Sequence, residues 1–147
     1  MEPSVTKVSN MKPDPVKQDR MAQLLGMEVL DVGPGHAKVR MQISERIFNA
    51  ADMVHGGAIF SLADYAFALA ANAGEEIGIA ISATMHYIHP AKQGFLYAEC
   101  CEVSRNKRMG TYAATVTNDA GQTMATFQGL AYYKSPKPET EVKKVRG

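Results

Sequence analysis

The stretch VHGGAIFSLADYAFALAANAG, residues 54–74, decides how the rest of the chain must fold. It is apolar and rich in alanine from Gly57 to Ala73 and stops at Gly74, so it predicts one long helix. A helix that is apolar almost all round needs cover on nearly every side. Its only formally charged side chain is Asp64, and a lone carboxylate in such a run needs either a partner or a chemical task.

Strand-like runs on both sides of this helix can supply the cover. Before it, residues 14–26 predict a short amphipathic helix, and residues 27–44 predict two strands joined at a Gly-Pro-Gly turn. Four more strands, joined by short hairpin turns, are predicted after it, at residues 79–90, 95–104, 110–118 and 122–134. The order predicts an α+β fold in which a curved antiparallel sheet of five to six strands wraps one long central helix.

The length of 147 residues fits one domain, expected over residues 17–134. Residues 1–16 are polar and contain prolines, and residues 135–147 are charged, so we expect a disordered lead-in and a flexible tail. The chain carries 16 lysines and arginines against 15 acids, a balance that argues against nucleic acid as a partner.

Two further classes of protein are disfavoured by the sequence. A membrane span at residues 53–74 would contain seven alanines, which add little insertion energy, and would place Asp64 near its centre, at a cost of roughly 2.5 to 3.5 kcal/mol. The adjacent Cys100 and Cys101 would point to opposite faces of a strand, which suits neither a disulfide framework nor a zinc site. We expect a reduced, cytoplasmic protein without a bound metal or cofactor.

Several polar groups cluster around the start of the long helix. Asn49 precedes His55 by six residues, Gly56 and Gly57 form the helix entrance, and Ser82 opens the strand after the helix. Read one at a time, these residues also suit an entry turn, a cap and a hydrogen bond within the sheet. Together with Asp64 they suit acyl transfer to water, because a helix start offers unpaired N–H groups to an oxyanion and a carboxylate activates water or attacks directly.

Spacing along the helix limits how these groups can meet. Gly56 and Asp64 are eight residues apart, which is about 12 Å along one helix axis. A reacting carbonyl must lie about 3 Å from both the base and the oxyanion donors. Two antiparallel copies of the helix across a two-fold axis meet this condition, with Asp64 of one chain facing the glycine entrance of the other.

The motif N-(x)5-HGG-(x)6-LAD, followed by a strand that contains serine, resembles the hotdog-fold acyl-CoA thioesterases of the PaaI-like branch, which is linked to phenylacetate degradation. The resemblance covers residues 20–134. It implies that Gly56, with Gly57 close by, supplies the oxyanion N–H, and that His55 and Asn49 hold the thioester carbonyl. It also implies that Asp64 of a neighbouring subunit is base or nucleophile and that Ser82 positions water.

The same resemblance implies an acyl-CoA substrate and a homodimer joined at its sheet edges, often paired again into a tetramer. Ala50 follows Asn49 where many members of the branch have glycine, so the acyl preference stays open. Residues expected to contact the phosphates of coenzyme A are Arg105, Lys107, Arg108 and Lys92. Residues expected to line the acyl pocket are Met53, Phe60, Tyr65 and Phe67.

Two other functions fit the same scaffold. A non-catalytic acyl-CoA-binding module would hold the thioester without cleaving it, and no appended DNA-binding segment favours such a sensor. A hotdog enoyl-CoA hydratase would pair aspartate and histidine a few residues apart, which the nine-residue spacing of His55 and Asp64 fits poorly.

Overall fold

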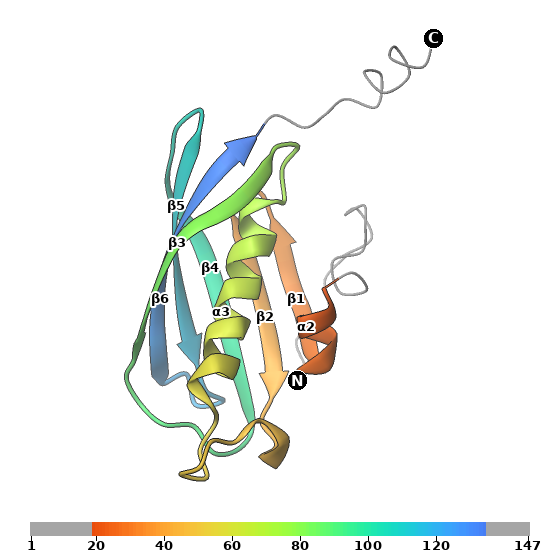
Figure 1. The fold of residues 1–147 in the computed structure, drawn as a ribbon, viewed down its shortest axis with the longest axis vertical. Coiled ribbons are helices and arrows are strands. Elements are labelled where there is room, and N and C mark those ends of the chain that lie inside the picture. Colours follow the sequence, from red (N-terminus) through yellow and green to blue (C-terminus); the bar gives the residue numbers. More distant parts are fainter. Residues whose placement is uncertain (1–18, 135–147) are drawn as a thin grey trace.

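The computed structural model describes residues 19–134, which form one sheet with a long helix lying against one of its faces (Figure 1). The predicted lead-in, residues 1–16, and the predicted tail, residues 135–147, lie outside the described residues. The helices are α2 (Arg20–Leu24), the 3-10 turn η2 (Glu45–Ile47) and α3 (Gly56–Ala71). The strands are β1 (Met27–Gly33), β2 (His36–Gln42), β3 (Ile77–Tyr87), β4 (Phe95–Arg105), β5 (Met109–Thr117) and β6 (Thr123–Lys134).

The sheet is antiparallel throughout, with the strand order β1-β2-β4-β5-β6-β3. The predicted central helix and all six predicted strands are therefore confirmed. One predicted connection is wrong: β3 and β4 are consecutive in the chain but do not pair, since β3 pairs with β6 at one edge of the sheet. The segment between β3 and β4 is a crossover rather than a hairpin turn.

Helix α3 packs one broad face against the sheet and leaves a narrow stripe open. Its buried residues include Leu62, Ala63, Ala66 and Phe67, which join the side chains of the strands in one core. Beyond its first residue, the partly exposed or exposed positions recur every three or four residues, so they share one side of the helix. They are Gly57, Phe60, Ser61, Asp64 and Ala68. The carboxylate that looked misplaced in the sequence therefore lies on the one uncovered side of α3.

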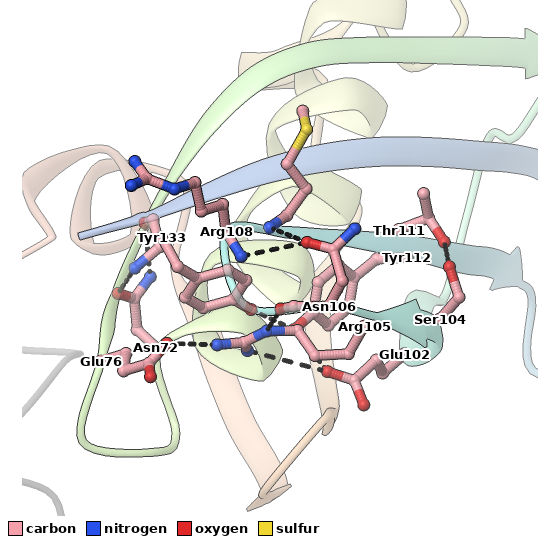
Figure 2. A network of polar contacts seen from close by, with 12 residues as sticks. Asn72, Glu76, Glu102, Ser104, Arg105, Asn106, Arg108, Thr111, Tyr112 and Tyr133 are labelled. Atoms are coloured by element: carbon pink, nitrogen blue, oxygen red, sulfur yellow. Dashed lines mark hydrogen bonds and ion pairs between the residues drawn. The ribbon is translucent and has the colours of Figure 1, made fainter. Parts of the chain in front are cut away.

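A polar network closes the far end of α3 (Figure 2). The guanidinium of Arg105 pairs with Glu76, which follows the helix, and lies 3.2 Å from the ring centroid of Tyr133. The hydroxyl of Tyr112 donates to Glu102 at 3.1 Å and is hydrogen-bonded to the Tyr133 hydroxyl. Burial and these two neighbours raise the pKa of Tyr112, so the phenol stays protonated. The network fixes the β4–β5 turn to the C-terminal end of α3.

Strand β3 leaves one edge of the sheet without a pairing strand among residues 19–134. The strand is eleven residues long, and Ile77, Ile79 and Ile81 are exposed. A long apolar edge of this kind is a template for pairing with another chain. None of the helices in this part of the chain is long and apolar enough to cross a membrane.

Candidate active site

The loop before α3 holds Asn49 in a fixed orientation. Its side-chain oxygen accepts the N–H of Ala51 at 2.9 Å and the N–H of Met53 at 3.2 Å. The amide oxygen is therefore occupied, and the amide nitrogen has no hydrogen-bond partner among the described residues. Because that nitrogen can only donate, Asn49 presents a donor to any carbonyl that reaches the loop.

His55 is the N-cap of α3, and its imidazole accepts the N–H of one of the two glycines but not that of the other. The Gly57 N–H donates to His55 Nδ1 at 2.8 Å, which occupies that amide. An accepting Nδ1 carries no proton, so the Nε2 of the neutral ring carries it and is a donor. The Gly56 N–H, by contrast, makes no hydrogen bond to any described residue. Of the two predicted oxyanion donors, Gly56 is the available one.

Tyr87, at the end of β3, is a neighbour of Gly56 that no sequence pattern singles out. Its hydroxyl donates to the Gly56 carbonyl at 3.1 Å, and its ring lies against the glycine Cα, where an added Cβ would come within 3.3 Å. Both residues line a cavity of about 400 Å³ at the helix entrance. The other residues that line it are Asn49, Met53, Val54, Ile59, Ile88, His89 and Pro90.

Asp64 lines a different cavity, of about 310 Å³, between α3 and α2. Phe60, Ser61 and Asp19 also line it. Burial raises the pKa of the Asp64 carboxyl, and the negative charge of Asp19 raises it further. No cation pairs with Asp64 in the described part of the chain. A half-buried carboxylate with a raised pKa is the usual condition of a proton acceptor in an active site.

The entrance cavity and the Asp64 cavity share no lining residue. One chain therefore brings Asn49, His55 and Gly56 together but keeps Asp64 apart from them, about 12 Å farther along the same helix. Each chain carries these groups in two separate cavities along α3, here called half-sites.

Two predicted site residues lie elsewhere. Ser82 is opposite Leu130 of β6, a residue that points away from the core, and it lines a hollow on the outer face of the sheet. Phe67 is buried in the core, 5.3 Å from the Tyr112 ring and 5.7 Å from the Phe127 ring, and lines neither half-site. Of the remaining residues expected in the acyl pocket, Met53 lines the entrance cavity, whereas Phe60 and Tyr65 line the Asp64 cavity.

The basic residues expected at the coenzyme A phosphates divide into two groups. Arg105 is held by Glu76 and Glu102, and Arg108 donates to the Tyr132 hydroxyl at 3.2 Å, both near the C-terminal end of α3. Lys107 is exposed in the same turn. Lys92 is also exposed, two residues after Pro90 in the wall of the entrance cavity. Within residues 19–134, no cluster of three or more His, Cys, Asp or Glu side chains could hold a metal ion.

The chain is similar to known proteins in sequence. The thioesterase superfamily matches residues 51–125, which include both half-sites' α3 residues. A protein from Archaeoglobus fulgidus, named only as a candidate esterase, is 38% identical over 126 residues, covering 85% of this chain and 82% of that protein. Acyl-coenzyme A thioesterase PaaI from Escherichia coli strain K12 is 30% identical over 117 residues, covering 79% of this chain and 84% of PaaI.

Solved structures agree with the sequence matches. The E. coli PaaI protein from the phenylacetic acid degradation operon superposes with a TM-score of 0.79 at 30% identity, covering 82% of this chain and 88% of that one. The TT0310 protein from Thermus thermophilus superposes with a TM-score of 0.74 at 34% identity, covering 78% of this chain and 97% of that one. The chain therefore belongs to the thioesterase superfamily and is a thioester hydrolase with the hotdog fold of the PaaI-like branch.

Proposed function

We propose that this protein hydrolyses acyl-CoA thioesters with aryl or short to medium-length acyl groups, giving the free acid and coenzyme A. The acyl-CoA substrate is suggested by the name of its E. coli relative, and the aryl group by the phenylacetic acid operon of that relative. The observation that carries the proposal is that one helix holds both a Gly56 N–H without a hydrogen-bond partner among the described residues and an Asp64 carboxyl with a raised pKa. Water is the only co-reactant, and no metal or cofactor takes part.

The complete site forms between two copies of the chain. The unpaired β3 edge continues into the β3 edge of a second copy, which sets the open stripes of the two α3 helices against each other in antiparallel fashion. Asp64 of one copy then faces the Asn49, His55 and Gly56 entrance of the other. Two such sites form in each dimer, and dimers pair again into tetramers.

The reaction uses these groups as follows. The Gly56 N–H, the Asn49 amide and the His55 Nε2–H donate to the thioester oxygen, which becomes negative when the carbonyl carbon is attacked. In one route the Asp64 carboxylate takes a proton from water, and the hydroxide formed attacks the carbon. In the other the carboxylate attacks first, and water then hydrolyses the mixed anhydride. In both, the C–S bond breaks and coenzyme A leaves as a thiolate, which takes up the proton released by water, so Asp64 is ionised again at the end of the cycle.

The same geometry brings positive charge to the entrance. If Asp64 of the partner lies level with Gly56, the last seven residues of the partner's α3 extend about 10 Å beyond it. The partner's β4–β5 turn, which is fixed to that end of α3, therefore lies beside the entrance. Lys107 and Arg108 of this turn, with Lys92 of the first chain, bind the coenzyme A phosphates. Arg105 contributes less because two glutamates already neutralise it.

Thiol release from a panel of acyl-CoA substrates tests the reaction. Asp64→Asn should lower turnover by about 10²- to 10⁴-fold, the usual contribution of a general base. Wild-type turnover in this variant would remove Asp64 from the mechanism. Tight binding of acyl-CoA without thiol release by the native protein would indicate a binding module, and hydration of crotonyl-CoA would indicate a hydratase.

A matched pair of substitutions at Gly56 tests the oxyanion donor. Proline is tolerated at the first helical position, and His55 already has the extended backbone (φ −60°, ψ 134°) that precedes proline. Gly56→Pro and Gly56→Ala both add a Cβ beside the Tyr87 ring, but only the proline removes the N–H. Turnover of the proline variant should fall about 10²-fold below that of the alanine variant. Equal turnover would exclude this amide as a donor.

Mixing two inactive variants tests whether the site is shared. When Asp64→Asn and Gly56→Pro chains are unfolded together and refolded in equal amounts, half of the dimers are mixed. Each mixed dimer holds one intact composite site, so about a quarter of the wild-type activity should return. No recovery, although mixed dimers are present, would mean that each chain owns its whole site.

A further inference from the structure

We propose that Tyr87 is a positioning residue for the oxyanion hole: its hydroxyl, by holding the Gly56 carbonyl, fixes the direction of the neighbouring Gly56 N–H. This inference rests on the proposed function of that N–H. Tyr87 itself does not donate to the substrate oxygen.

The position of Tyr87 makes this role available. It is the last residue of β3, on the same face of the strand as Met85, which packs against the core. From there the side chain extends across to the first turn of α3, a segment 31 residues earlier in the chain. The tyrosine is 55% exposed, so burial of its ring contributes little to the core.

The hydroxyl completes the fixation of one peptide unit. The Gly56 carbonyl and the Gly57 N–H belong to the same rigid plane. Tyr87 holds the oxygen of that plane at 3.1 Å, and His55 Nδ1 holds its N–H at 2.8 Å. The plane is therefore fixed at both ends by side chains, in addition to the helical hydrogen bonds that follow it.

Glycine makes such fixation necessary. The Gly56 N–H lies in the preceding peptide plane, which is joined to the fixed one only through the two backbone torsions of Gly56. A glycine without a Cβ rotates about these torsions at little cost, and the first turn of a helix lacks half of its backbone hydrogen bonds. When hydrogen bonds hold the next plane, only these two torsions can turn the Gly56 N–H, so its range of directions at the entrance cavity that Gly56 lines is narrower. Preorganisation of this kind is what makes an oxyanion donor effective.

Tyr87→Phe is the direct test, because it removes the hydroxyl and keeps the ring beside Gly56. We expect kcat to fall about 10-fold, the effect of one hydrogen bond near 1.4 kcal/mol, with less than about a twofold change in KM. Tyr97→Phe is the matched control. It removes a similar exposed bond, from the Tyr97 hydroxyl to Asp119 at 3.1 Å, on the outer face of the sheet, and should leave kcat unchanged.

A double-mutant cycle separates positioning from a merely structural effect. In a Gly56→Pro background the N–H is absent, so Tyr87→Phe should lower kcat no further. In a Gly56→Ala background the N–H remains, so Tyr87→Phe should still lower kcat, by less than 10-fold because alanine itself restricts the two torsions. An equal loss in the proline background, or a wild-type kcat in Tyr87→Phe alone, would overturn the role of Tyr87. Failure of the oxyanion donor itself would be recognised separately, by equal turnover of the two Gly56 variants.

Discussion

The ring of Phe67 occupies the space where a side chain at position 129 would have to lie: a Cβ added to Gly129 would come within 2.7 Å of Phe67 Cε2. The missing side chain on β6 lets α3 lie close to the sheet, with Phe67 against Tyr112 and Phe127. Because α3 carries both the Asp64 carboxylate and the Gly56 amide, this contact helps determine where these two groups lie.

Gly129→Ala should therefore destabilise the fold. The added methyl overlaps a buried ring that packs against Tyr112 and Phe127, and overpacking of this kind costs about 1 to 3 kcal/mol. Denaturant unfolding should report this loss. Gly33→Ala is the matched control, since an added Cβ there meets nothing within 4 Å. Equal stability of the two variants would mean that the packing of Phe67 does not require glycine.

Asp19→Asn should shift the pH dependence of hydrolysis. The proposed reaction needs the ionised Asp64, whose pKa is raised by burial first and by the charge of Asp19 second. As the pH is lowered, wild-type kcat/KM should therefore begin to fall at a pH above the range in which an ordinary carboxyl titrates. Asparagine keeps the cap that Asp19 places on α2, an acceptor for the Ala22 N–H at 2.9 Å, but removes the charge. The acidic limb of kcat/KM should move to lower pH in this variant, and an unmoved limb would exclude Asp19.

Asp64→Asn should gain stability while it loses activity. The folded state raises the pKa of this carboxyl above its usual value of 3.8, so the folded protein binds the proton more tightly than the unfolded chain. The stability that this preference contributes is full below pH 3.8 and is lost as the pH rises through the raised value.

Asparagine resembles the protonated carboxyl and stays neutral at every pH, so the variant does not suffer the loss that ionisation of the buried carboxyl causes in the wild type. It should therefore be more stable than the wild type at pH 8, and the difference should shrink toward pH 4. Unfolding at one fixed protein concentration measures this difference, because oligomers gain stability with concentration. A difference that does not change with pH would contradict the raised pKa.

Lys107→Ala should mainly affect substrate binding, whereas Arg105→Ala should mainly affect stability. Lys107 is exposed, so its removal should raise KM for acyl-CoA severalfold without a change in stability, and added salt should reduce the difference. Arg105 holds Glu76 and Glu102 and stacks on Tyr133, so its removal should lower the unfolding free energy by about 1 kcal/mol and raise KM less than the loss of Lys107 does. The reverse pattern would make Arg105 the phosphate ligand.

The sequence predicts which helices and strands form better than it predicts which of them lie side by side. The apolar run around Asp64 and the alternating strands are local signals, and each led to the observed helix or strand. The edge position of β3 depends on pairing with β6, which lies more than 30 residues later, and no local pattern encodes it. The same limit hid Tyr87, whose contact with Gly56 exists only once β3 and α3 are packed together.

Ser82 illustrates a different limit. Simple alternation would place it on the same face as Ala80, toward the core. A bulge between these two residues inserts Ile81, which reverses the alternation, so Ser82 lies opposite the outward-facing Leu130. One extra residue in a strand changes the face of everything beyond it, and nothing in the composition of the strand announces the bulge.

The two adjacent cysteines lie on opposite faces of β4, as the sequence predicted, with Cys100 buried and Cys101 exposed. Burial raises the pKa of Cys100 to about 12, so this thiol is protected twice, by inaccessibility and by protonation. A disulfide reagent added to the folded enzyme would therefore titrate one sulfur for each chain at once and the second only on denaturation. Colorimetric measurement of liberated coenzyme A relies on the same reagents. Such a measurement therefore needs a blank that contains the enzyme without substrate, because the exposed Cys101 also reacts.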